Sequence, residues 1–458
     1  MNAHGPTVAA PVAVGKVTVV NIGDTITKKG IVWTRQPPGC TNLPGRSNLP
    51  AITPEDLNWD VDLQKLKDLD QGEWTRVVDA IWFGDMTQQA KQASKAARSV
   101  MKWDENRFKD VDADEWRLFI LYHWLATLFP HKGVVNLWKK MPVFGKQVRS
   151  PANLGKYGIS RERFKDIRAV LPFAVAPESE WTKAVKTWDM TQVWMKEIRV
   201  ERLKLLGMFD GTPGDSKNVN KKSLWEILDE TMIQWACKTS KTGNHKRTGG
   251  APNITKEDRK PDPIGDMHKN GVELHCGLTL AMEVVMGADM TDSLPHVKEP
   301  SCFPREKLGA TAACVARLGK GMKRGRVDGD SWFTGPKACV RQRTVEDQDY
   351  SGILKTSHAG TPYHEALLAC TDLSRGTWVT FTATHVAVDI MLIAYVYSYS
   401  NTPCVLLTTC GSDAPGRLYG VGHVDEHGNV TTTMIAKPEA ITSYHDGNTR
   451  IDDRNSLR

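Results

Sequence analysis

Three acidic motifs, far apart in the chain, contain the residues best suited to metal-dependent chemistry. They are centred on Asp229, Asp330 and Asp452. Cleavage of a phosphodiester without a covalent protein intermediate uses two divalent cations, one activating the attacking hydroxyl and one stabilising the leaving oxygen. Magnesium prefers oxygen ligands and keeps several waters, so two or three carboxylates suffice. Because a fold can gather carboxylates from distant segments, spacing alone does not select these three aspartates.

Each motif also has an ordinary structural interpretation. Asp229 and the glutamate after it are typical of a charged strand edge. Asp328 and Asp330 flank a glycine, which is typical of a turn. Asp452 is typical of a helix N-cap or of an acid in a first helical turn. Each of these interpretations is the commoner one when its motif is taken alone, so only a joint pattern favours chemistry.

Taken together, the motifs resemble those of piggyBac-type transposases, in the same order. The first catalytic segment of that family is similar to Leu228-Asp229-Glu230-Thr-Met-Ile, and the second, Asp-x-Trp-Phe, to Asp330-Ser-Trp332-Phe333. The third is similar to Arg450-Ile-Asp452-Asp-Arg-Asn455. Within the Asp328-Gly-Asp330 turn, the resemblance selects Asp330, because Trp-Phe follows it at the family's spacing.

Two further segments resemble the same family. Arg259-Lys260-Pro-Asp-Pro-Ile-Gly265 is similar to its Lys-Pro-x-x-x-Gly turn. Residues 159–173, which include Ser160-Arg161-Glu-Arg163-Phe164, are similar to the helical region that precedes its catalytic core. The resemblance covers residues 110–458.

The resemblance implies an α/β fold, with a ribonuclease-H-like mixed-sheet catalytic core, a β-rich insertion and a preceding all-helical domain. It implies that Asp229, Asp330 and Asp452 are the catalytic residues and hold two Mg²⁺ or Mn²⁺ ions. The expected activity is that of a DDE transposase, which nicks transposon ends, forms hairpins and transfers strands into TTAA targets. The expected partners are DNA and a second copy of the chain, and the expected location is the nucleus.

The sequence departs from the family pattern near its end. Asn455 stands where the family usually has a further acidic residue, and the chain stops soon after Asp452 without a cysteine-rich tail. These departures predict either a fragment or a domesticated copy. A second hypothesis is therefore a non-catalytic, transposon-derived DNA-binding protein, and a third is an interaction scaffold that uses the Trp-rich helical half.

Composition agrees with an ordered protein and is compatible with a polyanionic partner. Of the 458 residues, 40% are hydrophobic and 25% charged, and 15 are tryptophan, which favours a packed fold over disorder. The net charge of +7 suits nucleic acid, although many other proteins share it. Nine cysteines without a CxxC pair predict reduced thiols rather than a zinc ribbon. The most apolar helical stretch, residues 118–129, is too short to span a bilayer.

Periodicity and turn residues divide the chain into five regions. We expect a flexible tail with at most a weak hairpin over 1–57, and a helical dimerisation and DNA-binding region over 58–217. The first part of the core follows over 218–347, the β-rich insertion over 348–435, and the final core helix over 436–458. Within these regions we predict helices over 116–129, 160–171 and 303–318, and strands over 271–280, 283–286 and 386–396.

Basic residues near the motifs are candidates for contacts with DNA phosphates. Arg161 and Arg163 lie on the helix that begins after Ser160, opposite its apolar face. Lys260, Lys323 and Arg324 lie in polar segments around the core. An ordinary solvated surface is the alternative for each of these residues.

Overall fold

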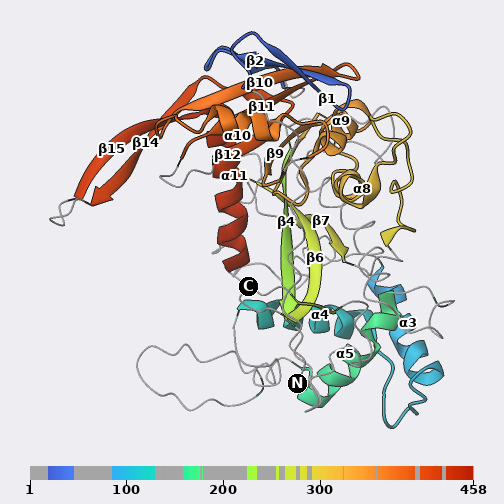
Figure 1. The fold of residues 1–458 in the computed structure, drawn as a ribbon. Helices are drawn as coiled ribbons and strands as arrows, with labels where there is room; N and C mark the ends of the chain where they lie inside the picture. Colours follow the sequence, from blue (N-terminus) through green and yellow to red (C-terminus); the bar gives the residue numbers. More distant parts are fainter. Residues whose placement is uncertain are drawn as a thin grey trace, which may run out of the picture.

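A single mixed sheet organises the larger part of the computed structural model (Figure 1). The structure describes residues 19–45, 85–128, 138, 158–175, 178, 224–234, 254–256, 264–274, 279–285, 291–322, 324–356, 358–397, 403–424 and 430–456. In these residues eleven strands join in the order β1-β2-β10-β11-β12-β9-β8-β4-β6-β5, with β7 paired to β6. Their bounds are Thr25–Lys28 (β1), Ile31–Gln36 (β2), Trp225–Gln234 (β4), Ile254–Lys256 (β5), Ile264–Glu273 (β6), Thr279–Val284 (β7), Arg326–Gly329 (β8), Asp349–Leu354 (β9), Trp378–His385 (β10), Val388–Tyr395 (β11) and Cys404–Thr408 (β12).

The middle of the sheet is parallel and its flanks are antiparallel. Strands β4, β8 and β9 run in the same direction, whereas every other pair in the sheet is antiparallel. Parallel neighbours require crossover connections. Helix α9 (Pro336–Thr344) lies between β8 and β9 in the chain, and α8 (Gly309–Leu318) precedes β8. This mixed α/β arrangement agrees with the fold class expected from the sequence.

The core lies between the sheet and these helices. Strand β11 is apolar along most of its length, and Ile390 to Tyr395 are fully buried. A strand buried on both faces carries such a continuous apolar run instead of an alternating one. The same core includes Val327 of β8, Phe333 and most of the apolar side chains of α8. A short helix, α10 (Tyr363–Ala369), covers β10 and β11.

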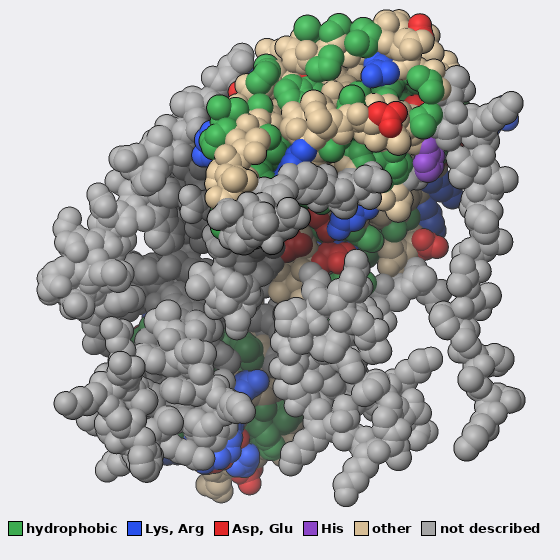
Figure 2. Space-filling view, turned by 60° about the vertical axis from the view of Figure 1, so that its left-hand side comes forward, with side chains coloured by type: hydrophobic (Ala, Val, Ile, Leu, Met, Phe, Trp, Pro, Cys, Tyr) green, Lys and Arg blue, Asp and Glu red, His purple; other side chains and the backbone are tan. Residues whose placement is uncertain are grey.

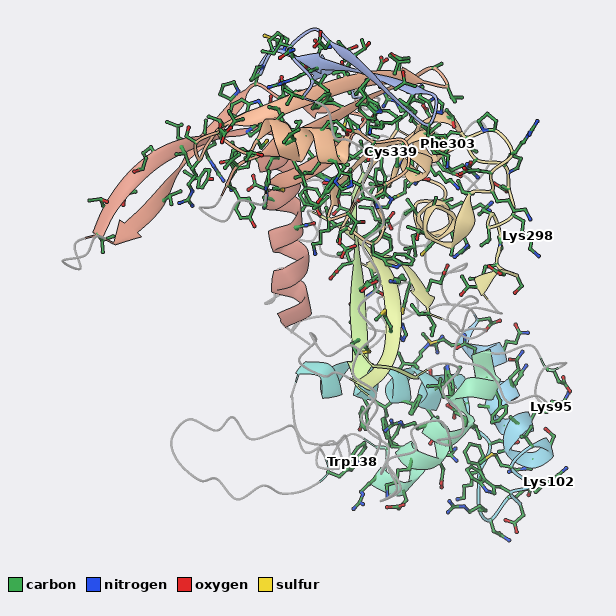
Figure 3. The ribbon with its side chains drawn as sticks, viewed as in Figure 1. Lys95, Lys102, Trp138, Lys298, Phe303 and Cys339 are labelled. Atoms are coloured by element: carbon green, nitrogen blue, oxygen red, sulfur yellow. The ribbon has the colours of Figure 1, made fainter. Side chains whose placement is uncertain are left out.

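Three helices form a second apolar core at the other end of the molecule. They are α3 (Met86–Ser99), α4 (Ala113–Leu128) and α5 (Arg161–Val175), and their shared core is rich in aromatic rings. Trp138 packs on this core, whereas Phe303 and Cys339 belong to the sheet-bearing part (Figure 3). Ser160 caps α5, since its hydroxyl accepts a hydrogen bond from the amide of Arg163 at 3.1 Å. The helices predicted over 116–129 and 160–171 are confirmed.

Helix α11 (Glu439–Ser456) closes the described chain. It follows a strand pair, β14 (Pro415–Val424) and β15 (Val430–Pro438), that projects from the sheet-bearing part (Figure 1). The helix then descends beside β4 and packs on it. Another two-stranded pair joins β13 (Gly411–Ser412) to β3 (Asn42–Leu43). Among the described helices none has the length and apolar character needed to cross a membrane.

The structure differs from the sequence-based expectations at three places. Residues 19–45, expected in a flexible tail with at most a weak hairpin, contain the hairpin β1–β2, and Ile31 and Trp33 are fully buried there because β2 pairs with β10. The strand predicted over 271–280 is divided between the end of β6 and the start of β7, which are paired antiparallel. The helix predicted over 303–318 begins only at Gly309.

The region expected as a β-rich insertion, residues 348–435, is rich in strands, and its first four strands are part of the main sheet. Strands β9 to β12 continue the same sheet as β4 and β8, with β9 directly beside β8. The strand predicted over 386–396 is β11, and it lies between β10 and β12 in this sheet. Each cysteine that the structure describes is a free thiol.

Candidate functional site

Asp229 and Asp330 meet at the centre of the sheet. Strands β4 and β8 are parallel neighbours, and Leu228 is the register partner of Gly329. The next residue along each strand is one of the two aspartates. Because paired strands lie about 4.8 Å apart, the two backbone positions are adjacent although they are distant in the sequence. The first two sequence-predicted site residues are therefore brought together.

Local packing fixes the backbone around Asp330. Its carboxylate accepts a hydrogen bond from the amide of Trp332 at 2.9 Å, and its carbonyl accepts one from the hydroxyl of Thr334 at 2.8 Å. Gly329 has no room for a side chain, because a Cβ there would lie 2.5 Å from the Tyr350 hydroxyl. Phe333 is fully buried beneath this turn. The strand therefore ends at Gly329 and presents Asp330 directly after it.

A buried lysine lies beside the two aspartates. Lys269 on β6 is the register partner of Glu230 on β4, and the two side chains form an ion pair. The lysine Nζ also lies 3.5 Å from the ring centroid of Trp332. Burial lowers the pKa of Lys269 to about 8, against the opposing attraction of nearby acids that include Asp330 and Asp229. A positive charge is thus enclosed among the carboxylates.

Lys269, Glu230, Asp330 and Trp332 line a cavity of about 690 Å³ on the face of the sheet that α8 covers. Its polar wall includes Glu230, Lys269, Asp330 and Lys355, and the indole of Trp332 forms another part. A second ion pair, in which Arg317 of α8 donates to both oxygens of Glu283 at 2.6 Å, completes this wall. Figure 2 shows acidic and basic side chains gathered side by side below the sheet-bearing part. The cavity has the size of a small-ligand site.

Asp328 has different surroundings from Asp330, two residues away. Its side chain is fully buried, and its oxygens accept hydrogen bonds from Arg326 at 2.7 and 3.1 Å. Arg326 also donates to Ser443 of α11 at 2.9 Å. Burial raises the pKa of Asp328, although Arg326 opposes the rise. The carboxylate of Asp328 is occupied by Arg326, which itself reaches α11, and this favours Asp330 as the residue available to a ligand.

Helix α11 carries the third predicted residue, Asp452. The hydroxyl of Tyr444 donates to the carbonyl of Gly329 at 3.1 Å, so the helix is tied to the end of β8. Gly447 faces Ile227 of β4 so closely that a Cβ would lie 2.8 Å from it. Asp452 lies five residues further along the helix, about 7.5 Å at 1.5 Å per residue. From Ile227 to Asp229 the strand advances a similar distance, about 6.6 Å.

Helix α11 packs on β4, but the side chain of Asp452 is outside the described residues. Among the side chains that the structure does describe, no group of three or more Asp, Glu, His or Cys could hold a metal ion. The two-metal site stays a prediction.

The predicted DNA-contacting residues have different environments. The guanidinium of Arg163 donates to both oxygens of Glu115, at 2.7 and 2.6 Å, and lies 4.5 Å from the ring centroid of Phe108. It therefore joins α5 to α4 instead of standing free for phosphate. The Arg161 side chain is 42% exposed, and Arg324 is exposed just before β8. Lys260 and Lys323 lie outside the described residues.

Sequence reasoning did not identify Lys269 or the Glu283–Arg317 pair. Lys269 occurs in the segment Met267-His-Lys-Asn-Gly271, which carries no recognisable motif. Its strand was predicted to start only at residue 271. A strand predicted from residue 264 onwards would have included Lys269. Its position beside Glu230 would still have required the register between the two strands.

No protein-family model matches the sequence, and no curated protein matches it either. The fold is similar to that in a cryo-EM structure of a piggyBac transposase synaptic complex with hairpin DNA, with a TM-score of 0.52 and 14% sequence identity. The similarity covers 83% of this chain and 67% of that chain. It shows that the chain has a transposase-like fold.

Proposed function

We propose that this chain is a piggyBac-like DDE transposase domain that cleaves DNA and transfers strands with divalent metal ions. The observation that carries the proposal is the parallel pairing of β4 with β8, which makes the backbone positions of Asp229 and Asp330 neighbours, with Asp330 lining a polar cavity. The similarity of the fold to a piggyBac transposase bound to hairpin DNA supports it. Transposon-end DNA and a TTAA-type target are the proposed substrates, and the nucleus is the proposed location.

The proposed core is ribonuclease-H-like. Support comes from the mixed sheet, in which the antiparallel strands β7, β6 and β4 are followed by the parallel strands β8 and β9 with helices between them. Helix α11 packs against β4 and would complete the core with Asp452. In this proposal Asp229, Asp330 and Asp452 hold two Mg²⁺ or Mn²⁺ ions.

The residues of the chain have distinct roles in the proposed reaction. Bound metal ions would activate the attacking hydroxyl and stabilise the leaving oxygen. Asp330, fixed by its contact with the Trp332 amide, holds its carboxylate in one position before the substrate enters. Positioning and electrostatics provide most of the catalysis of phosphoryl transfer. Asp328 and Arg326 keep β8 and α11 in register and touch no reacting atom.

The test is nicking of duplex DNA that carries the sequences flanking the gene, in Mg²⁺, by the wild type and by D330N. We expect D330N to lose activity by about 10²–10³-fold or more, the scale of losing one preorganised group at the reacting centre. D372N, at an exposed aspartate beyond α10, is the matched control and keeps full activity.

Equal nicking by D330N and the wild type would overturn the proposal. Binding of the same DNA by the wild type without any nicking would favour the alternative of a non-catalytic, transposon-derived DNA-binding protein. In that case the affinity falls steeply with salt, with a log–log slope of about −0.9 for each phosphate contact.

A further inference from the structure

The ammonium of Lys269 occupies an unusual position for a lysine. Its side chain is only 5% exposed, and it is held on one side by the carboxylate of Glu230 and on another by the face of Trp332. Burial of a charged group is costly unless partners compensate it. Lys269 lines the same cavity as Asp330, one of the carboxylates proposed to bind metal.

On the other wall of the cavity, the carboxylate of Glu283 is already paired with a different cation. Glu283 is neutralised by the two-point contact from Arg317, which also donates to the carbonyl of Pro295 at 2.7 Å. Lys355 lies on the exposed part of the wall. Lys269 is therefore the buried cation of this cavity on the strand that pairs directly with β4, whereas Arg326 of β8 is bound by Asp328.

A fixed ammonium and a divalent cation in one site repel each other. Each lowers the other's affinity for the shared carboxylates, and the effect is strong where water is excluded. A DNA phosphate that enters the site adds a negative charge and offsets that repulsion. By linkage, metal binding and DNA binding then strengthen each other by the same factor.

We propose that Lys269 is a built-in counter-cation that keeps divalent metal affinity low until DNA enters the site. The proposal rests on the proposed function, because it assigns regulation to the same carboxylates. Before metal binds, Lys269 stabilises the acidic residues against their mutual repulsion. Its strand register with Glu230 and its contact with Trp332 hold it in that position.

The experiment measures Mn²⁺ binding by the full chain, from the electron paramagnetic resonance signal of free Mn²⁺, with and without duplex DNA that carries the flanking sequences. In the wild type we expect weak binding that DNA strengthens. In K269M we expect metal affinity without DNA to rise roughly fivefold or more, the lower end of typical couplings, and the strengthening by DNA to shrink. K269R keeps the charge and behaves like the wild type.

K355M is the matched control, because it removes a lysine from the exposed wall of the same cavity. Its Mn²⁺ affinity changes much less than that of K269M. Thermal melting of each variant shows that it is folded. The proposal is overturned when folded K269M binds Mn²⁺ no more tightly than the wild type, or when K355M shows the same increase.

D330N separates this inference from the proposed function. If D330N abolishes Mn²⁺ binding but K269M does not bind Mn²⁺ more tightly than the wild type, the proposed metal site is supported and the proposed role of Lys269 is wrong. When D330N leaves Mn²⁺ binding unchanged in both the wild-type and K269M backgrounds, the metal is not at this site, and the proposed function falls with the inference.

Discussion

At the scale of single residues, surroundings distinguish side chains of the same type. Asp328 and Asp330 belong to one short motif, yet the first is buried against Arg326 and the second lines a cavity. Glu230 and Glu283 line the same cavity, and each is held by a cation, Lys269 or Arg317. What a carboxylate can do here is decided by its neighbours.

His358 makes stability depend on pH. Burial lowers its pKa below the ordinary value of about 6.5 that it has in the unfolded chain. The unfolded state therefore binds a proton more readily, and stability falls as the pH falls through 6.5 towards the folded pKa. We expect H358Q to lose less stability than the wild type between pH 7.5 and 5.5, as measured by the urea midpoint. Equal losses in the two proteins would contradict this assignment.

At the scale of elements, the site depends on the pairing of β4 with β8 and on the docking of α11. The strand pairing sets Asp229 beside Asp330. The helix is held against the same strands by Tyr444, whose hydroxyl reaches the carbonyl of Gly329, and by the close approach of Gly447 to Ile227. A shift of α11 would move Asp452 relative to the other two aspartates.

Gly447 tests this docking. A leucine there would overlap Ile227 and push α11 away from β4, since even a Cβ would lie 2.8 Å from the Ile227 side chain. We expect G447L to be less stable by about 1–3 kcal/mol, as for other overpacked cores, and to nick DNA more slowly than the wild type. Thermal melting and the nicking assay measure the two effects.

D446A is the neighbouring control, because Asp446 is exposed and makes only a long contact of 3.5 Å with Arg417. Its stability should change by no more than about 0.5 kcal/mol. A G447L protein as stable and as active as D446A would show that α11 is not closely docked.

At the scale of the whole molecule, one sheet joins the first described residues to the site. Strand β2 pairs with β10, and the sheet continues through β11, β12 and β9 to β8 and β4. Residues 19–45 are thus structurally part of the sheet-bearing body. The three helices α3, α4 and α5 have their own core and are stabilised separately.

Trp33 tests the contribution of the early strands. It is fully buried, and its indole nitrogen donates to the carbonyl of Gly360 at 2.8 Å. We expect W33A to lose about 3–5 kcal/mol, the usual cost of removing a buried large aromatic side chain, measured by urea unfolding. The adjacent V32A removes a side chain that is 51% exposed and costs far less. Similar midpoints for the two variants would refute the role of β2 in the core.

Much of the local structure was determined by the sequence itself. Acidic residues and Ser160 mark the starts of α4 and α5, and the apolar run of β11 marks a buried strand, because helix caps and hydrophobic periods depend on neighbouring residues. The three acidic motifs were recognised as similar to those of a transposase family. The order of strands and helices gave the α/β class.

The tertiary structure alone decided which distant residues meet. The pairing of Leu228 with Gly329, the register of Lys269 on Glu230 and the addition of β2 to β10 join segments far apart in the chain. No local pattern specifies such partners, since a strand's alternation is the same beside any neighbour and its register depends on what it packs against. The sequence therefore specifies the residues of the candidate site, and the non-local strand pairings bring them together.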